Sequence, residues 1–123
     1  MSTTAHILLV DDDADLRQCL VDVLEDAGYL VKTASSGREA LRLLAGDDLP
    51  GLILLDLMMP DLNGWQFYEE KQKIGRLASI PVLVVTASRA LGASFPGSEV
   101  LLKPFSVETV VEKVEQLVSR VNN

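Results

Sequence analysis

The sequence has one cysteine, no long apolar run and few basic residues, and each shortage excludes a class of protein. With Cys19 as its only cysteine, the chain cannot form an internal disulfide, which suits a reducing cytoplasm. A membrane-spanning helix needs about 20 successive apolar residues, and no stretch approaches that length. The run Ile7–Val10 is too short for a secretory signal and is followed at once by acids. We therefore expect a cytoplasmic protein without membrane insertion.

Basic residues are outnumbered by acidic ones. The chain has 11 lysine and arginine residues against 18 aspartate and glutamate residues, and its formal net charge is −7. Because nucleic-acid binding needs a basic surface, we expect no nucleic-acid partner. The acid excess has two readings: it keeps the protein in solution, or it includes a crowded acidic site that recruits a divalent cation.

Length and composition predict one domain. A chain of 123 residues fits a single domain. Its apolar fraction of 48% is enough for a core that needs neither a disulfide nor a structural metal. Repeats, low-complexity tracts and internal linkers are absent from the sequence. We expect one domain over residues 1–123, with its core at about 6–121, no attached effector domain, and a monomeric or weakly dimeric state.

Short apolar runs alternate with helical patterns along the chain. Fully apolar runs such as Leu52–Leu55 are typical of strands buried on both faces. The pattern predicts five strands, at residues 7–10, 29–33, 52–55, 82–85 and 100–102. It predicts helices at about 16–27, after Ser35-Ser36 until Gly46, at about 64–76, and from Ser106 to Val121. Cys19 falls in the first helical pattern, where we expect a small packing residue.

This alternation predicts an α/β fold. Apolar strands separated by helices favour a single doubly wound parallel sheet with helices on both faces. Five such strands suit the flavodoxin-like order 2-1-3-4-5. Ligands in these sheets bind beyond the carboxyl ends of the strands, where the strand order reverses.

Polar residues follow four of the five predicted strands. Asp11 and Asp12 come directly after the first strand, and Asp56 follows the third. Thr86 ends the fourth strand and Lys103 follows the fifth. Because the carboxyl ends of parallel strands share one edge of the sheet, we expect these side chains to meet there.

The chemistry of this set points to phosphoryl transfer. Three neighbouring carboxylates repel one another and raise one another's pKa. A hard cation resolves the conflict, and Mg²⁺ prefers a few carboxylates together with water. Lys103 adds positive charge and Thr86 adds a hydroxyl donor for a phosphoryl oxygen. The set therefore suits transfer of a phosphoryl group to a carboxylate nucleophile.

Four motifs on these strand ends resemble the receiver domains of two-component response regulators, which share a CheY-like fold. The resemblance extends from about His6 to Val121. It rests on the Asp11-Asp12 pair, on Thr86-Ala87, on Lys103-Pro104-Phe105, and above all on the run Asp56-Leu57-Met58-Met59-Pro60-Asp61-Leu62-Asn63-Gly64.

The resemblance implies a role for each matching residue. Asp56 would be the phosphoacceptor, and Asp12 would bind Mg²⁺ directly while Asp11 acts mainly through water. The backbone carbonyl of Met58 would be a further ligand. Thr86 would bond the phosphoryl group and Lys103 would pair with it. The Lys103–Pro104 peptide bond is expected to be cis.

The implied function is a phosphoacceptor signalling module of a two-component system or phosphorelay. It would take its phosphoryl group from a sensor histidine kinase or phosphotransfer protein and then change its binding surface for a downstream protein. It would catalyse only its own Mg²⁺-dependent phosphorylation and dephosphorylation, and so would not be an enzyme acting on other substrates. The alternatives are a phosphorylation-independent adaptor with the same fold and, less favoured, a phosphatase that uses Asp11-Asp12-Asp13. For Asp13 alone we expect a helix cap.

Two features depart from the family pattern. The stretch from Thr86 to Lys103 is short for a receiver, and it contains Gly92, Pro96 and Gly97, which disfavour helix. We therefore expect the fourth helix to be missing, shortened or replaced by a loop. Val100 stands where the family usually has an aromatic ring that reorients on phosphorylation. We hypothesise that the signal instead uses the surface around residues 88–99 and the last helix.

Overall fold

The computed structural model describes residues 6–59, 62–87 and 99–122, and for side chains it extends to residue 118. All five predicted strands are present and pair in parallel in the order β2-β1-β3-β4-β5, which confirms the predicted fold class. Along the chain the elements are β1 Ile7–Val10, α1 Ala14–Asp26, β2 Val31–Ala34, α2 Gly37–Leu44, β3 Leu52–Asp56, α3 Gly64–Lys73, α4 Gly75–Ala78, β4 Val82–Thr86, β5 Glu99–Leu102 and α6 Val107–Asn122.

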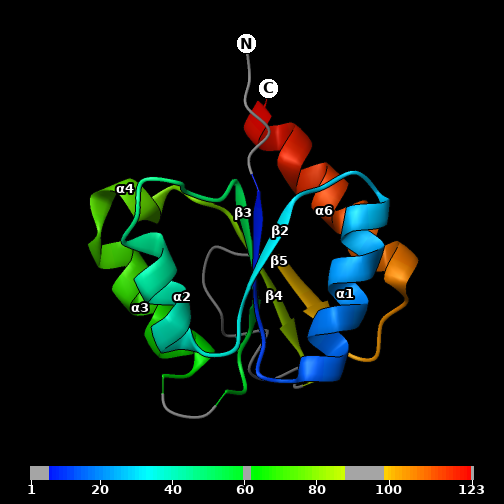
Figure 1. Ribbon diagram of the computed structural model, residues 1–123, viewed down its shortest axis with the longest axis horizontal. Helices are drawn as coiled ribbons and strands as arrows, with labels where there is room; N and C mark the ends of the chain where they lie inside the picture. Colours follow the sequence, from blue (N-terminus) through cyan, green and yellow to red (C-terminus); the bar gives the residue numbers. More distant parts are fainter. Residues whose placement is uncertain (1–5, 60–61, 88–98, 123) are drawn as a thin grey trace.

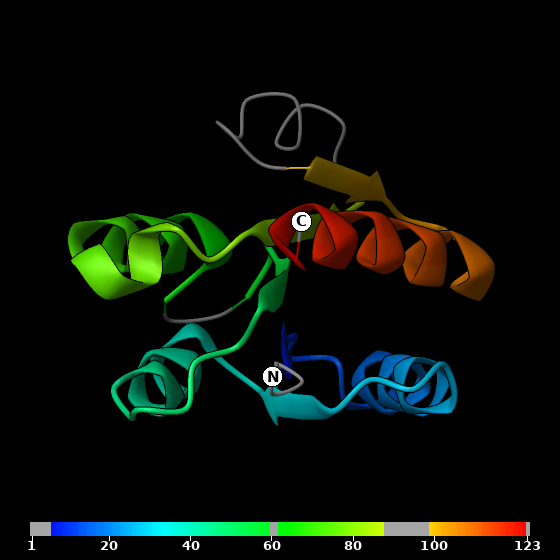
Figure 2. The same ribbon diagram turned by 90° about the horizontal axis from the view of Figure 1, so that it is seen from above.

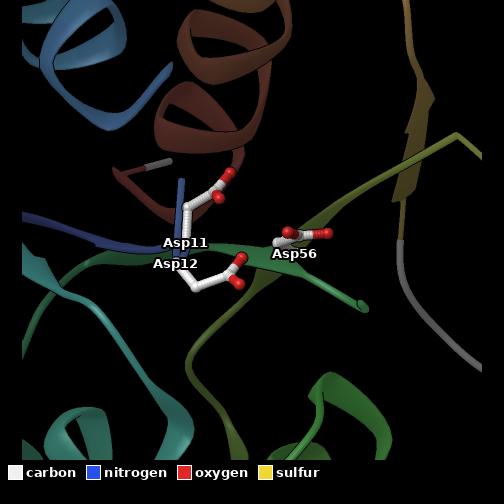
Figure 3. Close-up of side chains that lie close together, drawn as sticks. All are labelled: Asp11, Asp12 and Asp56. Atoms are coloured by element: carbon white, nitrogen blue, oxygen red, sulfur yellow. The ribbon is translucent and has the colours of Figure 1, made fainter. Parts of the chain in front are cut away.

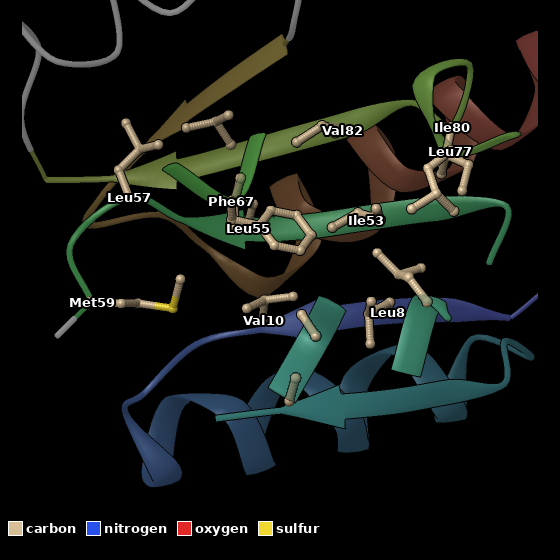
Figure 4. Packing of buried hydrophobic residues seen from close by; sticks show 14 residues of the cluster. Leu8, Val10, Ile53, Leu55, Leu57, Met59, Phe67, Leu77, Ile80 and Val82 are labelled. Atoms are coloured by element: carbon tan, nitrogen blue, oxygen red, sulfur yellow. The ribbon is translucent and has the colours of Figure 1, made fainter. Parts of the chain in front are cut away.

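The sheet lies between two layers of helices. Helices α1 and α6 cover one face, and α2, α3 and α4 cover the other (Figures 1 and 2). Successive side chains of each central strand point to opposite faces of the sheet. In β1, Leu8 and Val10 pack towards α2 and α3, whereas Ile7 and Leu9 pack towards α1 and α6. Figure 4 shows the first of these clusters, with the Phe67 ring over Ile53 and Leu55 of β3. The fully apolar strands are thus explained by burial on both faces.

Local signals define the ends of the helices as the sequence indicates. The Asp13 carboxylate accepts hydrogen bonds from the backbone N–H groups of Asp15 and Leu16, so the predicted cap of α1 is confirmed. Gly28, beyond the end of α1, has a φ of +100°, a left-handed conformation that glycine adopts without strain. Cys19 lies exposed on α1, so the expectation that it packs in the interior is wrong.

The predicted helix over residues 64–76 is interrupted. Helix α3 ends at Lys73, Ile74 adopts an extended conformation with φ −102° and ψ 112°, and α4 follows from Gly75. The Ile74 carbonyl then accepts hydrogen bonds from the N–H groups of Leu77 and Ala78. The apolar pattern continues through the break, because Leu77 is buried in the same core cluster as Phe67, so periodicity could not reveal it. The prediction for the fourth helix falls on residues 88–98, which lie outside the described residues.

Among the helices of the described residues, none is both long and apolar enough to cross a membrane.

Gly64 allows α3 to begin directly against the end of β3. A Cβ atom at this position would lie 2.7 Å from the carbonyl oxygen of Asp56 and 2.7 Å from the Cα of Leu57. The Gly64 N–H donates to the Leu57 carbonyl at 3.2 Å, so helix and strand end are also hydrogen-bonded. Only a residue without a side chain fits this approach.

We expect Gly64→Ala to destabilise the fold by about 1–3 kcal/mol, because the segment after Asp56 must move. Gly75→Ala is the matched control, since a Cβ there meets nothing within 4 Å. That variant should be as stable as the parent or more stable by up to about 1 kcal/mol, because alanine favours helix. Urea unfolding measures both. A Gly64→Ala protein as stable as the parent would contradict this account of the close approach.

Lys71 is a charged residue in the interior that the sequence did not single out. Its side chain is 1% exposed. The Nζ atom donates to Gln72 Oε1 at 2.7 Å and to the Ala78 carbonyl at 3.1 Å, and it lies 5.4 Å from the centre of the Tyr68 ring. Burial lowers the pKa of Lys71 from 10.5 to about 8. The lysine therefore links α3 to the carbonyl end of α4, and its charge is costly to bury.

The lowered pKa of Lys71 should make the free energy of unfolding depend on pH. Folded Lys71 releases its proton near pH 8, whereas the unfolded chain holds it to about pH 10.5, so the unfolded state binds more protons in between. The free energy of unfolding of the parent should therefore rise, relative to Lys71→Met, by on the order of 3 kcal/mol across this window. Urea unfolding at several pH values measures the difference. The exposed Lys73→Met is the control and should follow the parent; identical pH profiles for Lys71→Met and parent would refute the lowered pKa.

Candidate functional site

Three carboxylates meet at the carboxyl edge of the sheet. Strands β1 and β3 are parallel neighbours, and Val10 pairs with Leu55. Asp11 and Asp56, the next residue on each strand, therefore lie side by side at the same edge of the sheet. One oxygen from each of Asp11, Asp12 and Asp56 lies within 4.8 Å of the others. Figure 3 shows the three side chains gathered at the ends of β1 and β3. The structure thus brings together the acidic residues that the sequence placed in one site.

Asp11 is the most confined of the three. Its side chain is 0% exposed, and its Oδ1 accepts a hydrogen bond from the Asp13 N–H at 2.9 Å. Its Oδ2 is buried and has no hydrogen-bond partner among the described residues. Burial raises the pKa of Asp11, while the Asp13 N–H and the charge of Lys103 oppose that rise. A buried carboxylate oxygen without a donor is a group that a bound cation would satisfy.

Asp56 ends β3 and is 4% exposed. Its Oδ1 accepts a hydrogen bond from the Met58 N–H at 3.1 Å, and its Oδ2 lies 3.9 Å from the Nζ of Lys103. Burial raises the pKa of Asp56 to about 6 and the charge of Asp11 adds to the rise, while the Met58 N–H and Lys103 oppose it. Asp56 is therefore ionised at neutral pH but held in a site that penalises its charge.

Lys103 is the positive group that faces the acids. Its Nζ lies 4.0 Å from Asp11 Oδ2 and 3.9 Å from Asp56 Oδ2, so it bridges the two buried carboxylates. Its backbone N–H donates to the Thr86 carbonyl at 2.8 Å, which joins the ends of β4 and β5. The Lys103–Pro104 bond is cis, as expected.

Thr86 and Met58 complete the predicted set. Thr86 is fully buried at the end of β4, one residue beyond Val85, which pairs with Asp56. The side chain of Met58 is 62% exposed beside the acidic site, and its N–H is already bound to Asp56. That the Met58 carbonyl is a metal ligand, and that the Thr86 hydroxyl bonds a phosphoryl oxygen, stay predictions.

The donor set fits Mg²⁺. Carboxylate oxygens are the ligands that this hard cation prefers, and it keeps several waters. Asp12 is exposed and Asp11 and Asp56 are buried, so the three carboxylates would hold a cation from the buried side and leave it open to water on the other. Asp13 is not in the cluster, because its carboxylate caps α1.

Sequence reasoning missed one residue that contacts the site. Arg17 in α1 donates from Nη1 to the backbone carbonyl of Asp11 at 2.7 Å. No motif marks this contact, because it joins a helical side chain to a main-chain atom. Val100, the departure at the usual aromatic position, is half-buried in β5 and packs against the cluster on the α2 and α3 face.

The pKa of Asp56 predicts how the site affects stability. The folded protein holds this proton to about pH 6 and the unfolded chain only to about 3.8, so the folded state binds more protons in between. Asp56 therefore adds to the free energy of unfolding below about pH 4, and this stabilisation is lost as the pH rises through 6. Without divalent cations, the free energy of unfolding of Asp56→Asn should rise relative to that of the parent by on the order of 3 kcal/mol between pH 4 and 7.

Chemical unfolding across this pH range measures the gain. Asp47→Asn is the control, because this exposed carboxyl lies at a pocket with His6, away from the acidic cluster. Its pH profile should match that of the parent. If Asp56→Asn also matched the parent, the raised pKa of Asp56 would be wrong.

Known proteins resemble this chain throughout. The family model described as response regulator receiver domain matches residues 7–115. The transcriptional regulatory protein CpxR homolog of Haemophilus influenzae is 36% identical over 121 residues, which cover 94% of this chain and 51% of that protein. The chain spans about half the length of the curated relatives it matches.

Solved structures agree with the family match. The CheY-like response regulator receiver domain protein of Methanospirillum hungatei has a TM-score of 0.85 at 30% identity, over 98% of this chain and 99% of that one. The response regulator protein TrrA of Thermotoga maritima, solved in complex with Mg²⁺ and BeF, has a TM-score of 0.81 at 29% identity. That match covers 92% of this chain and 98% of the other.

Proposed function

The chain belongs to the response regulator receiver domain family, and we propose that Asp56 is its phosphoacceptor. The observation that carries this proposal is the surroundings of Asp56 at the switch point of the sheet. Its carboxylate is buried beside two other acids, and Lys103 Nζ lies 3.9 Å away. A nucleophilic oxygen, a cation site and an ammonium group thus occupy one small volume, which is what phosphoryl transfer needs.

In the proposed reaction, a carboxylate oxygen of Asp56 attacks the phosphorus of a phosphohistidine roughly in line. The new P–O bond forms as the P–N bond breaks, and the leaving imidazole nitrogen keeps the electron pair. Lys103 pairs with the charge on the transferred group, and the Thr86 hydroxyl donates to one of its oxygens. Mg²⁺, held by Asp11, Asp12, Asp56 and the Met58 carbonyl, would supply charge neutralisation when bound.

The product is an acyl phosphate that water hydrolyses, so the protein would catalyse only its own phosphorylation and dephosphorylation. Met58 stands exposed beside the site, where its side chain is placed to affect the approach of the hydrolytic water.

The partners follow from the family. A receiver domain works with a histidine kinase, and we propose a sensor histidine kinase or phosphotransfer protein as the donor for this chain. The downstream partner is a protein that recognises the surface changed by phosphorylation. Several curated relatives are named as transcriptional regulators and are about twice as long as this chain. We propose that residues 1–123 form one receiver domain that acts in the cytoplasm, as a monomer or weak dimer, without contacting nucleic acid itself.

The phosphorylation-independent adaptor is not favoured by the structure. A chain that had lost phosphoryl transfer would have no need to keep three acids and a lysine at one edge of the sheet. The burial of Asp11 and Asp56 is costly, as their raised pKa values show, and such a cost is typical of functional sites.

Phosphorylation from acetyl phosphate or a phosphorylated kinase tests the proposal. We expect labelling of the parent that requires Mg²⁺ and disappears in Asp56→Asn. Asp47→Asn, an exposed carboxyl outside the acidic cluster, is the control and should be labelled like the parent. Mass spectrometry of the labelled protein should place the group on the peptide that contains Asp56. Labelling that persists in Asp56→Asn, or a parent that no donor labels while it still binds Mg²⁺, would refute the assignment.

A further inference from the structure

Arg17 reaches from α1 back to the end of β1. Its Nη1 donates to the Asp11 carbonyl at 2.7 Å, across six residues of sequence. Its own backbone N–H donates to the Asp13 carbonyl at 2.9 Å, at the start of α1. Arg17 therefore holds the segment from Asp11 to Asp13 at both of its ends, once through its side chain and once through its backbone.

Each polar group of Asp11 except Oδ2 has a hydrogen-bond partner, and Arg17 is the partner of its carbonyl. The Asp11 N–H donates to the Ala34 carbonyl at 3.1 Å, which fixes the residue to β2. Its Oδ1 accepts from the Asp13 N–H. Within the described residues, the Arg17 bond is the one that fixes the Asp11 carbonyl.

That carbonyl belongs to the peptide group between Asp11 and Asp12. A peptide group is planar, so a bond that fixes the direction of its C=O also fixes where the Cα of Asp12 lies. Asp12 is exposed and is not held by burial, unlike Asp11 and Asp56. The direction of the Asp12 carboxylate therefore depends on the peptide that Arg17 holds.

The charge of Arg17 acts on a different acid, Glu39. The positive charge that lowers the pKa of both Asp11 and Asp56 is that of Lys103. Hydrogen bonds from Ser35 chiefly lower the pKa of Glu39, and Arg42 and Arg17 add smaller lowering effects. The guanidinium thus has Glu39 as a nearby acid, and its observed contact with the site is the hydrogen bond to the Asp11 carbonyl.

We propose that Arg17 is a positioning residue for Mg²⁺: it orients the Asp11–Asp12 peptide so that the Asp12 carboxylate converges with Asp11 and Asp56. The proposal rests on the proposed function, because it concerns the same cation site. It predicts that loss of the Arg17 side chain weakens Mg²⁺ binding although no ligand is removed. Partners that orient metal ligands typically change affinity by about 10-fold or more when they are removed.

Calorimetric titration of the parent and its variants with Mg²⁺ at pH 7.5 tests this directly. We expect Arg17→Met to bind Mg²⁺ about 10-fold more weakly. Arg17→Lys keeps a donor of similar reach and should recover most of the affinity. Arg38→Met is the matched control: it removes the same charge from an exposed position in α2 and should leave the affinity unchanged. Circular dichroism and melting temperatures establish that each variant is folded.

A second readout separates positioning from a general loss of activity. In labelling from acetyl phosphate, Arg17→Met should need more Mg²⁺ for half its maximal rate, while the rate at saturating Mg²⁺ stays near that of the parent. A folded Arg17→Met with unchanged Mg²⁺ affinity would overturn the proposal, and so would tighter binding, which would mean that the charge of Arg17 repels the cation. If Arg17→Met does not fold, Arg17→Lys and Arg17→Gln decide: equal affinities in these two, whose donors differ in reach, would also overturn it.

The outcomes distinguish this proposal from the proposed function. Mg²⁺ affinity is measured without any phosphodonor, so a parent that binds Mg²⁺ but accepts no phosphoryl group refutes the function and leaves the role of Arg17 decided by the titration. A parent that binds no Mg²⁺ refutes both.

Discussion

The close burial of two like charges is the constraint on which the rest of this structure depends. The Asp11 and Asp56 carboxylates lie at neighbouring strand ends with almost no exposure, and one ammonium group, that of Lys103, lies about 4 Å from each. Burial raises the pKa of both carboxyl groups, and the single ammonium group of Lys103 offsets that rise only in part. The site is therefore ready for added positive charge, and the apolar core must supply the stability that it costs.

A parallel sheet provides what such a site needs. The functional groups come from the ends of four strands, β1, β3, β4 and β5, which are packed on both faces. The backbone of the sheet therefore sets the relative positions of the groups. The connections between strands and helices then refine the positions. Gly64 brings α3 against the carbonyl of Asp56, and Asp13 caps α1 while its N–H holds Asp11. Rigid strands and short bonded turns together allow like charges to remain close.

The sequence predicted the features that follow from short-range patterns. Apolar runs revealed the strands, and the polar residues at their ends revealed Asp11, Asp56 and Lys103, because the edge on which a parallel strand ends is fixed by its direction. It could not predict contacts made across the fold. The break at Ile74 leaves the apolar pattern intact, and the roles of Lys71 and Arg17 depend on backbone carbonyls that no side-chain pattern encodes.

The same geometry indicates how a phosphoryl group would alter the protein. Phosphorylation adds a charge of about −1.5 to −2 beside Asp56, which would draw Lys103 away from Asp11 and towards the new group. Lys103 is bonded through its backbone to the end of β4, and Phe105, two residues later, packs against the cluster beneath α6. A shift of Lys103 would thus be felt at the start of α6. Val100 in β5 has no ring to reorient, and among the described residues the packing of Phe105 supports a route from Lys103 to α6. The other part of the hypothesised signalling surface, residues 88–98, lies outside the described residues.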